Sequence, residues 1–181
     1  MRRLALIPLL SSLLPLPGCG YALLGHGVTV DPSIKRIGVP PFRDNTGKAG
    51  LEQKITQKVI EELLKHGKWD VVQETTGVDA LVEGELVSYN VAPVGFSEGE
   101  PSEAGQTNTQ ASQYAIFLTA RVRYTKTGES EPLWQNDAFS TRDEYDVGDD
   151  PAAFFDREDQ AIDRLASAFA RSLVSAMLEA F

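Results

Sequence analysis

The chain has 181 residues, of which 42% are hydrophobic and 24% charged, a composition that is typical of globular proteins and excludes a wholly disordered chain. Its 17 Lys and Arg against 26 Asp and Glu give a formal net charge of −9, which argues against a non-specific nucleic-acid binder. One Cys and two His are too few for an internal disulfide or a zinc site, so no metal or cofactor is expected.

Residues 1–18 resemble a bacterial lipoprotein signal peptide. Two arginines precede a mostly apolar stretch over residues 4–16, which is shorter than the roughly 20 residues that a membrane-spanning helix needs. Gly18 and Cys19 then match the end of a lipobox, in which the Cys is acylated and becomes the first mature residue. Because Gly20 is not the Asp typical of inner-membrane retention, we expect a lipid-anchored protein of the outer membrane, facing the periplasm.

The first part of the mature chain is predicted to be a tether followed by a strand. Residues 19–33 are expected to form a lipidated tether, and residues 34–181 a single domain. Alternating apolar residues predict a strand over 34–39, which Pro40 and Pro41 end because proline cannot continue a ladder. A turn-rich loop is expected over residues 43–50.

The next segments alternate between helical and strand patterns. Apolar residues recur every four positions from Leu51 to about Lys65, which predicts a helix that stops at Gly67. A short strand is expected over 69–72. Period-two alternation predicts three long strands with one buried and one solvent-exposed face, over residues 79–92, 113–126 and 132–145.

A polar segment and a second helix complete the chain. Residues 95–112 are rich in Gly, Ser, Thr, Gln and Asn, and we interpret them as a mobile loop. Asp150 and Pro151 are suited to begin a helix, and apolar residues recur at helical spacing from Ile162 to Phe181. The predicted fold is α+β, with two helices packed on one face of a mostly antiparallel sheet of four to five strands.

No catalytic motif is found in the sequence. Glu83 and Glu85 could serve as the carboxylate pair of a glycan-cleaving enzyme, because residues two apart on a strand share a face. Arg121 and Arg123 share a face of the following long strand, and we favour a cross-strand charge ladder over catalysis. With Phe117, these arginines make the helix-free face a candidate surface for a partner protein or for an amphiphile with an anionic headgroup.

Several ordered segments together resemble the LptE family of lipopolysaccharide-assembly lipoproteins. The resemblance covers nearly all of the mature chain, although each piece is short. The segments are Cys19-Gly20-Tyr21-Ala22-Leu23, Ile34-Lys35-Arg36-Ile37-Gly38-Val39-Pro40-Pro41-Phe42, Asn45-Thr46-Gly47, Leu51-Glu52-Gln53 and Asp79-Ala80-Leu81-Val82-Glu83-Gly84-Glu85-Leu86.

The resemblance implies a small outer-membrane lipoprotein that plugs the lumen of a large β-barrel translocon, LptD, and helps it assemble. It also implies delivery of lipopolysaccharide to the outer leaflet, with binding of its phosphorylated part by basic residues near strand ends. By charge and position, the candidate contacts for lipopolysaccharide or the partner are Phe117, Arg121, Arg123, Lys126 and Arg142.

Two other functions remain open. An accessory lipoprotein that activates a periplasmic peptidoglycan synthase, or a secretion-related lipoprotein, would share the Pro-Phe and Asn-Thr stretches. The missing long Pro-rich linker after Cys19 counts against the synthase activator, which must cross the periplasm. A glycan-acting enzyme would need an acid–base pair in a pocket.

Overall fold

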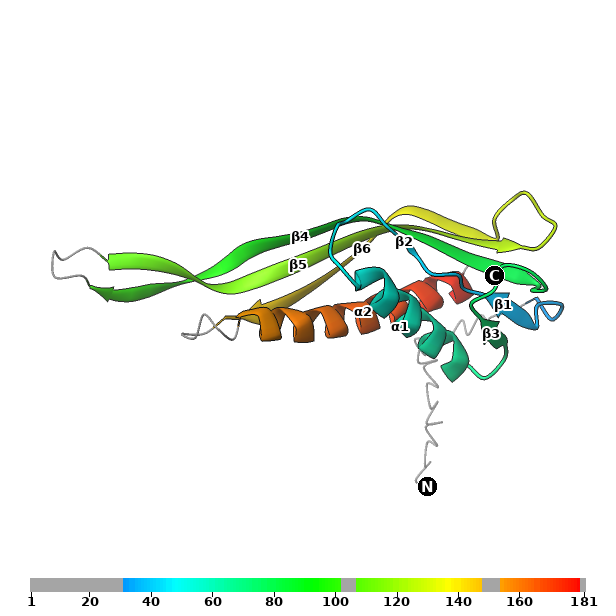
Figure 1. Cartoon of the computed structure of the whole chain (residues 1–181), viewed down its shortest axis with the longest axis horizontal. Helices are drawn as coiled ribbons and strands as arrows, with labels where there is room; N and C mark the ends of the chain where they lie inside the picture. Colours follow the sequence, from blue (N-terminus) through cyan, green and yellow to red (C-terminus); the bar gives the residue numbers. More distant parts are fainter. Residues whose placement is uncertain (1–30, 102–106, 148–153, 180–181) are drawn as a thin grey trace, which may run out of the picture.

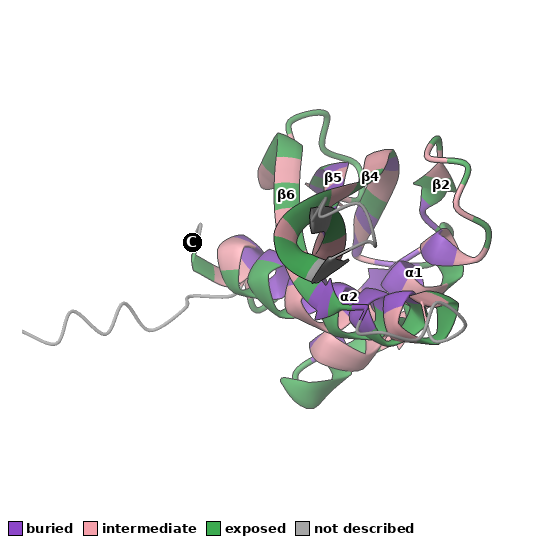
Figure 2. Cartoon of the chain, turned by 90° about the vertical axis from the view of Figure 1, so that its left-hand side faces the viewer, coloured by how far each residue is buried: buried purple, intermediate pink, exposed green. Residues whose placement is uncertain are grey.

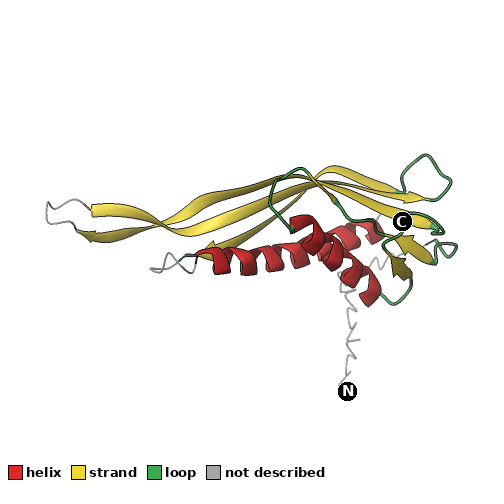
Figure 3. Ribbon diagram, in the orientation of Figure 1, coloured by secondary structure: helices red, strands yellow, loops and turns green. Residues whose placement is uncertain are grey.

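Both helices lie on one face of a six-stranded mixed sheet (Figures 1 and 3). The computed structural model describes residues 31–101, 107–147 and 154–179. In chain order the elements are β1 (Arg36–Gly38), β2 (Arg43–Asp44), α1 (Leu51–Lys65), β3 (Asp70–Val72), β4 (Ala80–Pro101), β5 (Thr107–Lys126), β6 (Trp134–Asp146) and α2 (Phe154–Glu179). The α+β prediction is confirmed, and the two-residue strand β2 brings the sheet to six strands.

The sheet is parallel at one side and antiparallel at the other. Its order is β3-β1-β4-β5-β6, and β2 pairs with β4 beyond the end of β1. Strand β1 is parallel to both of its neighbours, so that Ile37 lies opposite Val71 and Ala80. The β1–α1–β3 segment is therefore a crossover between adjacent parallel strands, an arrangement that the short strand patterns left open.

Strand β2 lies where a loop over residues 43–50 was expected. After Pro40 and Pro41 the chain returns to the sheet, and Arg43 pairs with Glu85 in parallel register. The backbone N–H of Asn45 continues this contact by donating to the carbonyl of Leu86 at 3.0 Å. A pairing between residues so far apart in sequence leaves no periodic signal over two residues, so the prediction was wrong for Arg43 and Asp44.

The predicted alternation of buried and exposed residues is confirmed for the core parts of β4 and β5, whereas β6 has four consecutive exposed residues, Gln135 to Ala138. The side chains of β5 that face the helices are buried, whereas Phe117, Arg121 and Arg123 on the other face are exposed. Figure 2 shows that the buried residues gather between the helices and the sheet. The buried sheet residues include Ala80, Val82, Leu86, Ile116, Leu118, Ala120, Val122 and Tyr124.

The prediction of a mobile loop over residues 95–112 is wrong for residues 95–101 and 107–112, and its middle, residues 102–106, lies outside the described residues. Strand β4 continues to Pro101 and β5 begins at Thr107, so both form a long antiparallel ribbon (Figure 1). An antiparallel ladder is held by backbone hydrogen bonds, and polar side chains are compatible with it where no core has to be covered. Register shifts between Pro93 and Gly95, between Gly95 and Phe96 and again after Glu98 show that this part of the ribbon is irregular.

Both helices follow the predicted apolar stripes. Helix α1 buries Leu51, Ile55, Val59 and Leu63, and the chain turns away at Gly67, whose φ of 63° is the left-handed conformation that glycine adopts readily. Helix α2 is described from Phe154, and its predicted start at Asp150 and Pro151 lies outside the described residues. The buried residues of α2 include Ile162, Leu165, Phe169, Leu173 and Met177.

A cluster of aromatic rings joins α2 to two separate parts of the sheet, on the face that the helices cover. Phe169 of α2 is fully buried, and its ring meets Phe42 and Phe139 edge to face, at centroid distances of 6.4 and 5.2 Å. Phe42 lies directly on Gly84 of β4, where an added Cβ would come within 2.2 Å of the Phe42 ring. Phe42 precedes β2 and Phe139 belongs to β6, so the cluster extends across the width of the helix-covered face, from β2 to β6.

A buried carboxylate joins α2 to β4 and to the segment before α1. Glu158 is 7% exposed, and its Oε1 accepts hydrogen bonds from the Lys48 ammonium at 2.8 Å and the Tyr89 hydroxyl at 2.7 Å. Burial alone would raise the pKa of Glu158, but these two hydrogen bonds outweigh it and hold the pKa below its ordinary value. The charged form of Glu158 is therefore part of the native packing.

Candidate functional site

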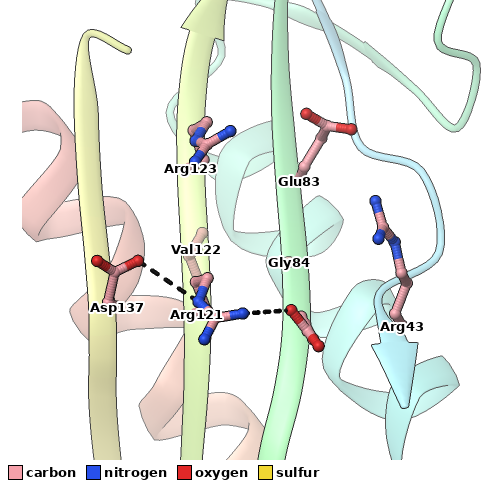
Figure 4. A pocket seen from close by; sticks show the side chains of 8 residues that line it. Arg43, Glu83, Gly84, Arg121, Val122, Arg123 and Asp137 are labelled. Atoms are coloured by element: carbon pink, nitrogen blue, oxygen red, sulfur yellow. Dashed lines mark hydrogen bonds and ion pairs between the residues drawn. The ribbon is translucent and has the colours of Figure 1, made fainter. Parts of the chain in front are cut away.

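The helix-free face of the sheet carries a polar hollow of about 240 Å³ (Figure 4). Its walls come from β2, β4, β5 and β6, because alternate residues of neighbouring strands project to the same side. Its charged lining consists of three arginines and three carboxylates, namely Arg43, Arg121, Arg123, Glu83, Glu85 and Asp137. The hollow therefore offers hydrogen-bonding groups of both signs in a confined space.

Arg121 is held in place by its neighbours. Its guanidinium lies 2.7 Å from the Glu85 carboxylate and 3.5 Å from the Asp137 carboxylate (Figure 4). The Asn45 side-chain amide also donates to Glu85. The cross-strand ladder predicted for the Glu83/Glu85 and Arg121/Arg123 pairs is thus formed at Arg121, whose charge is already paired with two carboxylates.

Arg123 and Arg43 differ from Arg121. Arg123 lies opposite Glu83 in the β4–β5 register, yet within the described residues neither Arg123 nor Arg43 forms an ion pair. Both are exposed and line the hollow on either side of Glu83 (Figure 4). Guanidinium groups in this state can donate bidentate hydrogen bonds to a phosphate or carboxylate without breaking a native contact.

Phe117 and Arg142 form a second patch on the same face. They are paired in the β5–β6 register, and the Arg142 guanidinium lies over the Phe117 ring at 5.3 Å from its centroid. Arg142 also contacts Glu144 on its own strand. Phe117 lies four residues before Arg121 on β5, so the patch is about 13 Å from the hollow.

Lys126 does not belong to either patch. It is the last residue of β5, and its ammonium donates to the Asp31 carboxylate at 2.7 Å, with Glu129 at 3.8 Å. The hydrogen bond with Asp31 raises the pKa of Lys126 above its ordinary value. Of the five predicted contact residues, the structure therefore brings together Arg121 with Arg123, and Phe117 with Arg142, and places Lys126 apart.

Sequence reasoning missed Arg43 and Asp137 as members of the hollow. Arg43 fell in a predicted loop, and only its long-range pairing with Glu85 brings it to the sheet. Asp137 lies two residues before the core-facing Phe139, so strict alternation would have placed it on the helix side, and only the register shift opposite Ala120 and Val122 brings it to the hollow. Cys19, the predicted lipidation site, lies outside the described residues.

Other kinds of site are not evident in the described part of the chain. No group of three or more His, Cys, Asp or Glu residues there is arranged to hold a metal ion. Among the helices of those same residues, none is long and apolar enough to cross a membrane.

Comparison with known proteins identifies a family and a shared fold. The family model described as LptE, lipopolysaccharide-assembly, matches residues 34–177. A solved structure from Xanthomonas campestris is similar with a TM-score of 0.52 at 12% identity, covering 81% of this chain and 85% of that chain. No curated protein matches the sequence.

Two lipoprotein structures are more distant. A putative lipoprotein from Caulobacter crescentus gives a TM-score of 0.45 at 9% identity, covering 77% of this chain and 89% of that one. The rare lipoprotein B from Shewanella oneidensis gives 0.39 at 12% identity, covering 80% and 98%.

Proposed function

Because the chain belongs to the LptE family of lipopolysaccharide-assembly lipoproteins, we propose that it plugs an LptD-like β-barrel and helps that barrel assemble. The observation that carries this proposal is the family match, which extends from residue 34 to residue 177. The proposed role is one of contact and placement in lipopolysaccharide transport, with no catalytic step. Residues 1–18 would be removed as a signal peptide, and Cys19 would carry the lipid that holds the protein at the outer membrane.

The character of the exposed face supports the plug role. The lumen of a transmembrane barrel is polar, and the charged hollow on the helix-free face has groups that remain hydrated or paired in such surroundings. An overall charge of −9 does not oppose a protein contact of this kind. Purification from native membranes in mild detergent is expected to recover one large β-barrel protein in an amount about equal to this chain. Recovery of a peptidoglycan synthase, or of no barrel, would contradict the proposal.

Arg43 and Arg123 are the proposed contacts for the phosphate groups of lipopolysaccharide. They combine exposure with the absence of a native ion pair in the described residues, whereas Arg121 is occupied by Glu85 and Asp137. Phe117 and Arg142 would extend the contact along β5 and β6. Lys126 is a weaker candidate because its ammonium already binds Asp31.

Charge reversal at the hollow tests this assignment. Arg43→Glu and Arg123→Glu are each expected to weaken lipopolysaccharide binding about tenfold to a hundredfold, because a charge-assisted hydrogen bond contributes about 1.5 to 3 kcal/mol. Binding to purified lipopolysaccharide is measured by titration calorimetry at fixed ionic strength. Arg171→Glu is the matched control. Arg171 is exposed on α2, and this substitution changes the net charge by the same amount. Equal affinities for all three variants would show that the hollow is not the site.

A further inference from the structure

A small apolar notch opens where the first described residue meets the core. Its lining comes from α1, α2, β1, β5 and the segments before β1 and β3, at the end of the molecule where β1, β3 and the C-terminal end of α2 meet (Figure 1). The lining includes Ile34, Trp69, Tyr124, Met177 and Leu178. Its volume of about 10 Å³ leaves room for about one methyl-sized group. Asp31 is the one charged residue in the lining.

The chain before Asp31 must start at the rim of this notch. Asp31 is fixed there, because its carboxylate accepts hydrogen bonds from the Lys126 ammonium at 2.7 Å and the Ser33 backbone N–H at 2.8 Å. Its carbonyl also accepts from the backbone N–H of Ile34 at 3.0 Å. Since consecutive Cα atoms are 3.8 Å apart, Val30 lies within one residue's reach of the notch.

The composition of residues 20–30 is unusual for a tether that runs through solvent. The segment contains Tyr21, Ala22, Leu23, Leu24, Val28 and Val30, and it has no Asp, Glu, Lys or Arg. Flexible linkers are rich in polar or charged residues, since apolar side chains in water favour burial against a nearby apolar surface.

We propose that residues 21–30 dock against the end of the domain formed by β1, β3 and the C-terminal end of α2, with one methyl group of Val28 or Val30 in the notch. The occupant is this chain's own segment, because that segment is apolar, is uncharged and continues from the rim. If Cys19 carries the lipid, as the proposed function requires, docking shortens the free tether to about two residues, or roughly 7 Å. An undocked tether of residues 19–30 could extend to roughly 40 Å. Docking would therefore hold this end of the domain close to the membrane surface.

Trp69 reports on the notch directly, because it is one of its lining residues. The chain has two Trp residues, so Trp134→Phe leaves Trp69 as the single emitter in the full-length mature protein. In this background we expect the double substitution Val28→Asn with Val30→Asn to increase quenching of Trp69 by acrylamide. Thr29→Asn, between the two valines, is the matched control and is expected to leave quenching unchanged.

Hydrogen exchange tests the docked segment itself. The amides of residues 21–30 are expected to exchange about tenfold more slowly than those of an unstructured peptide, and this protection should disappear in the Val28→Asn, Val30→Asn variant. Exchange at the unstructured rate together with unchanged Trp69 quenching would overturn the proposal. If Trp69 quenching increases in Phe181→Asn and not in the valine variant, Phe181 is the occupant of the notch and the proposal is overturned.

A second control separates this proposal from the proposed function. Docking does not need the lipid, so protection of residues 21–30 should persist in Cys19→Ser. Loss of protection in that variant would assign the notch to the acyl chain and overturn the docking of the valines. Recovery of the barrel partner is scored in a different experiment, so failure of either proposal leaves the other measurable.

Discussion

Replacing Phe169 by Ala is expected to lower the free energy of unfolding by about 3 to 5 kcal/mol, the cost of removing a fully buried aromatic ring and leaving a cavity. The ring contacts Phe42, which precedes β2, and Phe139 of β6, so the cavity would open between α2 and two separate parts of the same sheet face. Gly84 limits any relaxation of Phe42, because the ring already lies against its backbone.

Urea unfolding followed by circular dichroism measures this loss of stability. Phe155→Ala is the matched control: it deletes the same ring from the same helix at a position that is 72% exposed. We expect that control to change the free energy of unfolding by less than about 0.5 kcal/mol. Similar losses for the two variants would mean that the ring cluster does not hold α2 to the sheet.

Replacing Glu158 by Gln is expected to cost about 1 to 2 kcal/mol at neutral pH, because the Lys48 ammonium and the Tyr89 hydroxyl lose a charged acceptor. The cost should depend on pH. Glu158 has a folded-state pKa below its ordinary value of 4.5, so its contribution is fully present above that pH. The contribution is lost as the pH falls from 4.5 through the folded-state pKa.

Unfolding curves of the native chain and Glu158→Gln between pH 7 and pH 3 measure this dependence. The two free energies of unfolding should converge as the pH is lowered. Asp159→Asn is the control on the adjacent, exposed residue and should run parallel to the native chain. A constant difference between the native chain and Glu158→Gln across this range would show that the charge of Glu158 does not stabilise the fold.

Local patterns sufficed to predict most of the fold. Helix α1 was predicted over the observed residues, since its apolar stripe and the stop at Gly67 are both encoded within a few turns. The buried and exposed faces of β5 were also predicted, because strict alternation has one consistent register. Residues 95–101 and 107–112 were misjudged, since their strands depend on pairing with each other and not on burial of apolar side chains.

The hollow was only partly predictable for a related reason. Arg121 and Arg123 were recognised because both lie on one strand, where spacing alone defines their common face. Arg43 reaches the hollow through a two-residue parallel pairing with β4, and such pairing is set by the tertiary fold. The different states of Arg121 and Arg123 depend on where Asp137 and Asn45 lie, which spacing along one strand cannot indicate.

The position of β1 has a consequence for the order in which the molecule can form. Strands β4, β5 and β6 follow one another as hairpins, so their pairing can begin beside each turn and extend along the strands. Strand β1 has to find β4 across about 40 residues with no hairpin turn between them, and α2, which covers the sheet, follows β6. Until α2 has been made, the apolar side of the hairpins is uncovered, so a newly made chain should be most vulnerable to aggregation and proteolysis in the interval between β6 and α2.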